Sequence, residues 1–183
     1  SSIDYASKLI TMVSGIIIAS GVTAVYPKLS KLVQEKKEDD YHKEVAGSIE
    51  SIYFFVIPVA VGLFILAEPI IQVVFERGAF NRASTILTGG LLRFYSLSLI
   101  GETIYILITR VFYSVNDTKT PIRIMLVQVL FDIPLNFLLS SLIGINGLAL
   151  SSSIGMMAAG IYAIYCYKKR FASAKLKSSI RGL

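Results

Sequence analysis

Long stretches without a charged residue alternate with short lysine-rich segments along this chain. No charged residue occurs in residues 9–27, 51–67 or 133–167. A helix that crosses the hydrocarbon core of a membrane needs about 20 mainly apolar residues. The pattern therefore predicts five membrane-spanning helices, at about residues 4–26, 48–67, 84–114, 121–143 and 147–167.

Proline and glycine mark the expected helix ends. We expect the first helix to stop at Pro27, and Pro121 to occupy the first turn of the fourth helix, where proline is favoured. The sequence Gly144-Ile145-Asn146-Gly147 is a turn signal between the fourth and fifth helices. The predicted fold class is all-α, a polytopic membrane helix bundle.

The composition supports a membrane protein. Of the 183 residues, 54% are hydrophobic and 16% are charged, whereas a soluble domain carries about 25% charged residues. This composition excludes disorder, collagen and coiled coil, and the single cysteine, Cys166, excludes an internal disulfide. The chain opens on Ser1-Ser2, with neither an initiator methionine nor the basic start of a signal peptide. We therefore expect it to be a slice of a larger protein.

Lysine and arginine gather on one side of the predicted bundle. The segments after the first and third helices and the tail 168–183 are basic, whereas the opposite side carries only Arg77 and Arg82. Basic segments beside membrane helices stay in the cytoplasm, so these three are predicted to be cytoplasmic. The net charge of +6 follows from this rule, and we predict no nucleic-acid partner.

Residue sets that carry out covalent chemistry are scarce. The only histidine, His42, lies in a lysine-rich segment, where we expect a solvated loop residue. The sequence holds no glycine-rich phosphate loop, no paired-cysteine metal site and no HExxH motif. We therefore predict that the protein is not an enzyme and needs no cofactor, apart from the sodium ion considered below.

Charged residues within the predicted spans are candidates for binding a substrate, because a charge at the bilayer centre is costly and usually faces a cavity or a partner. Lys8 follows Asp4 by one helical turn. It is therefore either a member of a helix-end pair or a snorkelling lysine, or else a cation that receives an anionic substrate. Arg93 and Glu102 fall on opposite faces of the third helix. Each therefore needs a partner from another helix or water, and either role can be structural.

The fourth predicted helix holds an oxygen-rich corner. Asp132 and Asn136 share one face of the helix, and Pro134 between them frees a backbone carbonyl. Ser152 can add a hydroxyl and Leu148 a carbonyl from the fifth helix. Oxygen ligands of this kind suit a small hard cation, so the sequence predicts a sodium site. The alternatives are a polar cluster that only holds two helices together and an Asp132 that takes up and releases a proton.

Several ordered motifs resemble the MviN/MurJ family of lipid II flippases, and together they span nearly all of the chain. The more specific pair is Val74-Phe75-Glu76-Arg77-Gly78-Ala79-Phe80 and Asp117-Thr118-Lys119-Thr120-Pro121. Weaker matches are Tyr5-Ala6-Ser7-Lys8-Leu9, Tyr26-Pro27-Lys28-Leu29-Ser30, Arg110-Val111-Phe112-Tyr113-Ser114 and Gly147-Leu148-Ala149-Leu150.

The resemblance implies a multi-pass protein of the bacterial cytoplasmic membrane and part of the C-terminal lobe of a two-lobed transporter of the MOP superfamily. It implies a lipid-linked peptidoglycan precursor as substrate, moved outward by alternating access, with membrane lipids and an N-terminal lobe of the same protein as partners. Lys8 stands where the family usually has an arginine, and basic cavity residues are expected to hold the diphosphate. The sodium ligands Asp132, Asn136, Leu148 and Ser152 fall at matching positions, to be completed by an acid from a helix outside this chain.

Two other function classes remain open from the sequence. One is another exporter of the same superfamily, for a polysaccharide-linked lipid or a drug, which the two specific motifs disfavour. The other is a membrane scaffold of cell-wall synthesis that transports nothing. The replaced cavity arginine favours such a scaffold.

Overall fold

The computed structural model describes residues 2–16, 20–76 and 80–181, and the side chains among them up to Phe171. The described part of the chain forms seven helices and contains no strand, which confirms the all-α prediction. The helices are α1 (Ser2–Ser14), α2 (Ser20–Gln34), α3 (Glu38–Ile65), α4 (Ala67–Phe75), α5 (Arg82–Ser114), α6 (Lys119–Ile143) and α7 (Ile145–Arg181).

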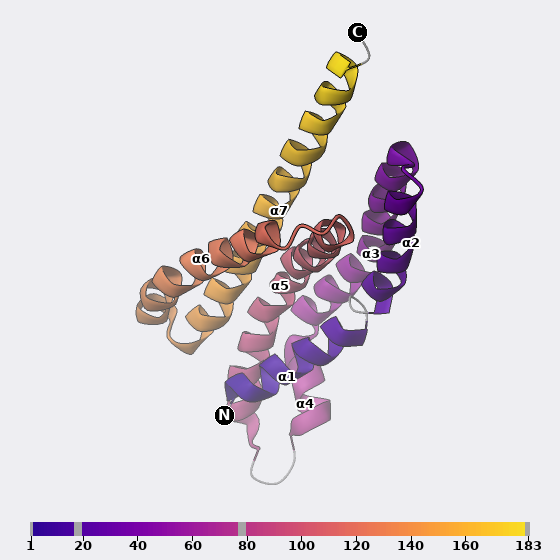
Figure 1. Ribbon diagram of the computed structural model, residues 1–183. Coiled ribbons are helices and arrows are strands. Elements are labelled where there is room, and N and C mark those ends of the chain that lie inside the picture. Colours follow the sequence, from indigo (N-terminus) through magenta and orange to yellow (C-terminus); the bar gives the residue numbers. More distant parts are fainter. Residues whose placement is uncertain (1, 17–19, 77–79, 182–183) are drawn as a thin grey trace.

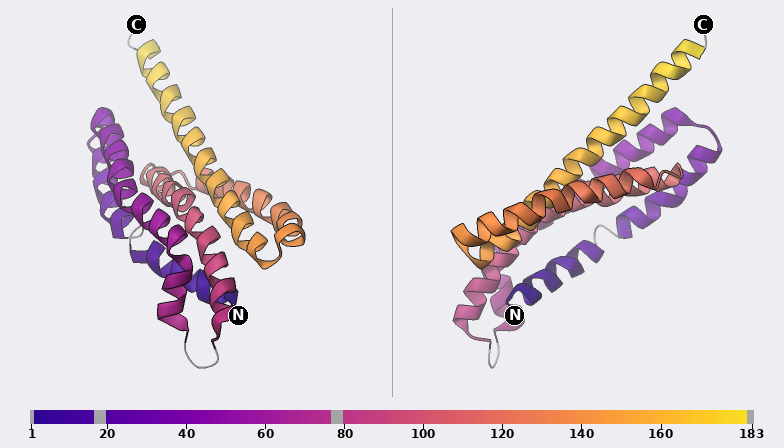
Figure 2. Two further views of the ribbon diagram at one scale, coloured as in Figure 1. Left: turned by 180° about the vertical axis from the view of Figure 1, so that it is seen from behind. Right: turned by 60° about the vertical axis from the view of Figure 1, so that its left-hand side comes forward.

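Helix α5 is the centre of the assembly (Figure 1). One side of it packs against α1, α2, α3 and α4, and the other side packs against α7, which forms a hairpin with α6. Figure 2 shows the α6–α7 hairpin from two further directions, at the edge of the assembly. Only Pro121 and Ile124 of α6 are buried, so its apolar surface is left for lipid or another part of the protein.

The first predicted helix, residues 4–26, is wrong in its extent. Two helices occupy this region, and α2 continues through Pro27 to Gln34 instead of stopping at the proline. Val22, Val25 and Leu29 are all buried on one face of α2. Packing therefore continues on both sides of the proline, and membrane helices tolerate proline where neighbours stabilise them.

Two other predicted boundaries are also wrong. Helix α3 begins at Glu38 and not near residue 48, and α7 runs through the predicted basic tail to Arg181. Three acidic residues in the first turn of α3 suit the positive end of the helix dipole. Tyr41 and Val45 are buried, so this early part of α3 packs against the rest of the protein rather than forming a loop.

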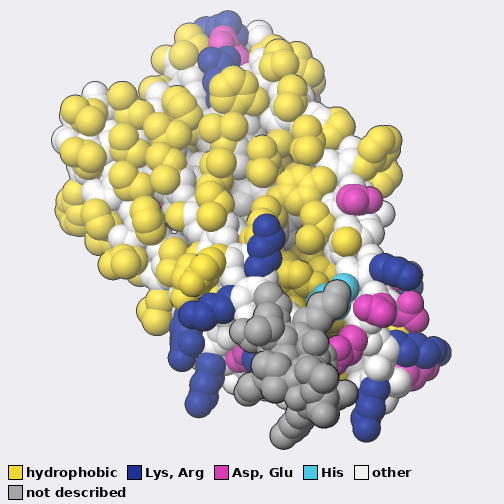
Figure 3. Space-filling view, turned by 90° about the horizontal axis from the view of Figure 1, so that it is seen from above, with side chains coloured by type: hydrophobic (Ala, Val, Ile, Leu, Met, Phe, Trp, Pro, Cys, Tyr) yellow, Lys and Arg dark blue, Asp and Glu magenta, His cyan; other side chains and the backbone are white. Residues whose placement is uncertain are grey.

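Four helices in the described residues are long and apolar enough to cross a membrane, whereas the sequence predicted five spans. They are Glu38–Ile65, Arg82–Ser114, Lys119–Ile143 and Ile145–Phe171. The difference arises because the first predicted span includes residues 17–19, which lie outside the described residues, and the helices described on either side, α1 and α2, are each too short to count as a span. Figure 3 shows one face of the molecule, where hydrophobic side chains cover most of the surface and charged side chains gather along one side.

Glycines allow α7 to approach both of its neighbours. A Cβ on Gly101 of α5 would lie 2.5 Å from the carbonyl oxygen of Met156, and one on Gly160 would lie 3.0 Å from the carbonyl oxygen of Gly101. On the α6 side, a Cβ on Gly147 would lie 2.2 Å from the carbonyl oxygen of Leu139. Close backbone contact at small residues is how helices pack in membranes, and it fixes the positions of the polar groups described next.

Candidate functional site

Lys8 lies on the exposed face of α1, opposite the buried residues Ala6, Ile10 and Ser14. The exposed position leaves the Lys8 side chain available to a group outside the described helices.

Aromatic contacts hold the start of α1. The ring of Tyr5 lies 4.9 Å from that of Phe75 and 5.3 Å from that of Phe80, between ring centroids. Phe75 ends α4 and Phe80 precedes α5. Residues 77–79 between them, which include Arg77 and Gly78 of the motif, lie outside the described residues. Two of the motifs noted in the sequence therefore meet in space, one turn before Lys8.

A polar contact holds the other end of α1. The Ser14 hydroxyl donates a hydrogen bond of 2.7 Å to Oε1 of Glu102 on α5. Arg93, on the same helix, donates from Nε to the carbonyl oxygen of Phe64, at 3.2 Å, and lies over the Phe64 ring. Glu102 and Arg93 thus have partners on two different helices, and no described contact joins either of them to Lys8.

Polar side chains of α6 and α7 meet at Asn136, one of the residues of the predicted oxygen-rich corner. Asn136 Oδ1 accepts a hydrogen bond from the hydroxyl of Ser151, which also lies 2.9 Å from the carbonyl oxygen of Leu148. Asp132 Oδ1 is buried and has no hydrogen-bond partner among the described residues. The hydroxyl that meets Asn136 is therefore that of Ser151, and not that of the predicted Ser152.

The helices approach closely at Asp132. A Cβ on Gly155 of α7 would lie 3.4 Å from Cβ of Asp132 and 3.1 Å from the carbonyl oxygen of Gln128. A buried carboxylate oxygen without a partner is expensive, and a cation or a proton would satisfy it. No cluster of three or more His, Cys, Asp or Glu side chains suited to a metal ion occurs in the described ranges, so amide, hydroxyl and carbonyl oxygens would supply the remaining ligands.

Asp117 joins the start of α6 to α7 at the predicted cytoplasmic side. Its Oδ1 accepts hydrogen bonds from the backbone amides of Lys119 and Thr120 at the start of α6, at 3.0 and 3.1 Å, and its Oδ2 accepts one from the Thr120 hydroxyl at 2.8 Å. Arg170 of α7 forms an ion pair with the same carboxylate. Partial burial opposes ionisation, but the bonds from Thr120 and the Arg170 charge outweigh it and hold the pKa of Asp117 below its usual value.

His42 is not the solvated loop residue that the sequence predicted. It lies in α3, and its Nδ1 is 2.7 Å from the hydroxyl of Tyr167. Its ring also contacts those of Tyr41 and Phe171. The sequence prediction failed because α3 begins earlier and α7 ends later than the apolar runs indicate, so their polar ends meet.

The described helices define a polytopic membrane-helix bundle, an all-helical protein with polar groups held between its candidate spans. The family model described as "Lipid II flippase MurJ" matches residues 1–181, and the chain belongs to this family. Family membership and the four candidate spans place it in the bacterial cytoplasmic membrane.

The similar proteins are considerably longer than this chain. The lipid II flippase MurJ of Thermosipho africanus is 32% identical over 181 residues, which cover 99% of this chain and 37% of the relative. A probable lipid II flippase MurJ of Bdellovibrio bacteriovorus is 32% identical over 164 residues, which cover 90% of this chain and 31% of the relative. The chain therefore spans about a third of the length of these relatives.

A solved structure has the same fold. It is titled "Lipid II flippase MurJ, inward closed conformation", and it superposes with a TM-score of 0.84 at 32% sequence identity. The match covers 98% of this chain and 39% of that structure. The arrangement of all seven helices is therefore that of one part of a MurJ-type transporter.

Proposed function

We propose that the protein containing this chain moves lipid II, the undecaprenyl-diphosphate-linked peptidoglycan precursor, across the bacterial cytoplasmic membrane. This chain would supply part of the C-terminal lobe, and an N-terminal lobe would supply the opposite wall of the cavity. The observation that carries the proposal is the agreement of sequence and fold with lipid II flippases over 98% of the chain. The activity is transport by alternating access, without covalent chemistry.

In this mechanism Lys8 contributes positive charge to the substrate cavity. Its exposed side chain lies between two anchors of α1, the Tyr5 ring contacts and the Ser14–Glu102 hydrogen bond, which fix the direction in which it can extend. A lysine is a compact point charge that can bind a diphosphate oxygen, although it lacks the bidentate fork of arginine. Arg93 and Glu102 act mainly by positioning helices, because both are engaged with protein partners.

A sodium ion between α6 and α7 would couple transport to an ion gradient. The ligands proposed from this chain are Asp132, Asn136, the Leu148 carbonyl and a serine hydroxyl, with Ser151 favoured over Ser152 by its contact with Asn136. The ion would shift the lobe between inward-open and outward-open states only through a difference in affinity for the two. The buried, unpartnered oxygen of Asp132 supports this role.

Growth rescue tests the proposed function. The gene product that contains residues 1–183 is expressed in a bacterium depleted of its own lipid II flippase, and its presence in the membrane is checked. Rescue is expected, together with accumulation of lipid II when the protein is withdrawn. A membrane-inserted protein that fails to rescue would contradict lipid II transport. Such a failure would favour the other exporter or the scaffold, which the family match does not favour.

A further inference from the structure

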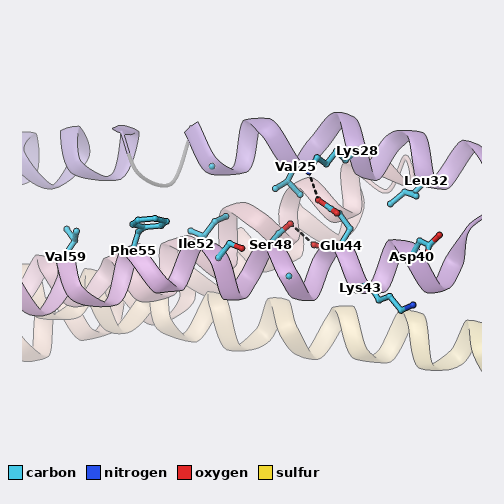
Figure 4. A pocket seen from close by; sticks show the side chains of 13 residues that line it. Val25, Lys28, Leu32, Asp40, Lys43, Glu44, Ser48, Ile52, Phe55 and Val59 are labelled. Carbon is cyan, nitrogen blue, oxygen red and sulfur yellow. Dashed lines mark hydrogen bonds and ion pairs between the residues drawn. The ribbon is translucent and has the colours of Figure 1, made fainter.

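An open groove of about 1070 Å³ runs between α2 and α3. Figure 4 shows its two walls, with Val25, Lys28 and Leu32 on α2 and a row of side chains from Val59 to Asp40 on α3. The groove lies on the far side of α3 from the α6–α7 hairpin (Figure 1). It is therefore separate from the oxygen-rich corner.

The groove changes from apolar to charged along its length. Val25, Ile52 and Phe55 line the part nearer the middle of α3, and Lys28 and Glu44 form an ion pair of 3.4 Å across it nearer the lysine-rich end. The apolar part of the groove runs along α3 from Ile52 to Val59, which is about 10 Å, and the charged part lies beyond it toward Asp40. The apolar part is shorter than half of the roughly 30 Å hydrocarbon core, so it fits within a single membrane leaflet.

The charged end carries both signs. Lys28 and Lys43 contribute two positive charges, and Asp40 and Glu44 contribute two negative charges. An anionic headgroup would bring its phosphate toward the lysines but would face two carboxylates as well. A zwitterionic headgroup with a primary ammonium complements the whole set, because its phosphate can bind lysine and its ammonium can donate hydrogen bonds to the carboxylates.

We propose that this groove binds one phospholipid of the cytoplasmic leaflet, with an ethanolamine-type headgroup over the Lys28–Glu44 ion pair, beside Asp40 and Lys43, and an acyl chain along Ile52 and Phe55. The cytoplasmic leaflet follows from the lysine-rich segment at this end of the groove. The bound lipid would fill the space between α2 and α3 and hold the two helices at a fixed spacing. This structural lipid is distinct from the transported substrate.

The absence of side chains at two positions keeps the groove open. Gly21 and Gly47 both line it, and no atom lies within 4 Å of the position that a Cβ on Gly47 would occupy. A large side chain at Gly47 would therefore fill the groove without meeting the backbone. Gly62 offers a matched control, because it also lies in α3 with nothing within 4 Å of its Cβ position but does not line the groove.

Native mass spectrometry of the purified full-length gene product tests the proposal. The protein is delipidated and titrated separately with phosphatidylethanolamine, phosphatidylcholine and phosphatidylglycerol of identical acyl chains. We expect the ethanolamine lipid to bind with the highest affinity, and Gly47→Phe to weaken that binding about tenfold while Gly62→Phe leaves it unchanged. Glu44→Gln should reduce the preference for ethanolamine over choline, since the trimethylammonium group donates no hydrogen bonds.

Three results would overturn the proposal. They are equal binding of the ethanolamine lipid by the Gly47→Phe and wild-type proteins, a preference for the anionic lipid that survives Glu44→Gln, and no retained lipid at all. All three results come from direct measurements of lipid binding. The outcome is therefore independent of whether the protein transports lipid II.

Discussion

The Ser14 hydroxyl lies 2.7 Å from Oε1 of Glu102 and joins the end of α1 to the middle of α5. Without that donor the half-buried carboxylate would lose this hydrogen bond, and a hydrogen bond to a charged group contributes about 1.5–3 kcal/mol. We expect Ser14→Ala to lower the free energy of unfolding by about 2 kcal/mol, measured by denaturation in detergent. Glu102→Gln keeps an acceptor oxygen and should cost less. A Ser14→Ala protein as stable as the wild type would show that the contact contributes nothing.

The contacts of Asp117 at the start of α6 predict that the free energy of unfolding depends on pH. Its folded-state pKa lies below the ordinary value of 3.8, so the ionised carboxylate stabilises the fold. That contribution is fully present above the ordinary pKa and is lost as the pH falls through the lower, folded-state value. We expect Asp117→Asn, which keeps the capping oxygen but removes the charge facing Arg170, to lower stability at neutral pH by up to about 1 kcal/mol.

Acid titration of the same pair of proteins checks this sign. The difference in unfolding free energy between wild type and Asp117→Asn should persist from neutral pH down to pH 4 and shrink below it, because the wild-type carboxyl then becomes neutral too. Arg170→Gln should give a similar loss at neutral pH and add little to Asp117→Asn in the double variant. A loss that grows on acidification would contradict the assignment.

Lys8 is expected to matter for transport and not for folding. Its side chain is exposed, so Lys8→Ala should change the unfolding free energy by less than about 0.5 kcal/mol. The same change should abolish growth rescue at equal membrane abundance, whereas Lys8→Arg should preserve it because the charge remains. Rescue by Lys8→Ala would reduce this residue to a charge at the helix surface.

The α6–α7 corner predicts a sodium response that depends on Asp132. A ligand that binds only the folded state raises its stability, so sodium should raise the melting temperature of the purified protein more than potassium does. Asp132→Ala should remove this difference, and Ser151→Ala should weaken it more than Ser152→Ala, because Ser151 contacts Asn136. A fully active, still sodium-responsive Asp132→Ala protein would exclude the proposed coupling.

Hydropathy predicted the fold class and the four long apolar helices α3, α5, α6 and α7, because membrane spans must satisfy their backbone internally and be apolar outside. It failed where tertiary contacts decide. Pro27 marks no helix end, since Val22 and Leu29 are buried on either side of it. The polar first turns of α3 are helical because Tyr41 packs against the chain and bonds to the carbonyl oxygen of Val111, a partner 70 residues away that no local pattern reveals.

The sequence predicted which residues of α6 would face α7, whereas the sodium site itself stays a prediction. Helical spacing placed Asp132 and Asn136 on one face, and the structure keeps both at the α6–α7 contact. The choice between Ser151 and Ser152 depends on the rotation of α7, which is set by glycine contacts with two neighbours. A signal was available, since Gly147 and Gly155 mark the side of α7 that approaches α6 and Ser151 lies midway between them.

Gly101 provides a test of the packing that orients α7. A Cβ at this position would lie 2.5 Å from the carbonyl oxygen of Met156, which is backbone and cannot rotate away. Gly101→Ala should therefore separate α5 from α7 and lower the unfolding free energy by about 2 kcal/mol or more. Gly62→Ala is the matched control, because nothing lies within 4 Å of its Cβ position, and alanine in a helix should even stabilise slightly. Equal stability of the two variants in detergent would mean that α5 and α7 are not held together by this contact. If the contact holds, Gly101→Ala should also weaken the sodium response without touching a ligand, because the rotation of α7 presents Ser151 to Asn136.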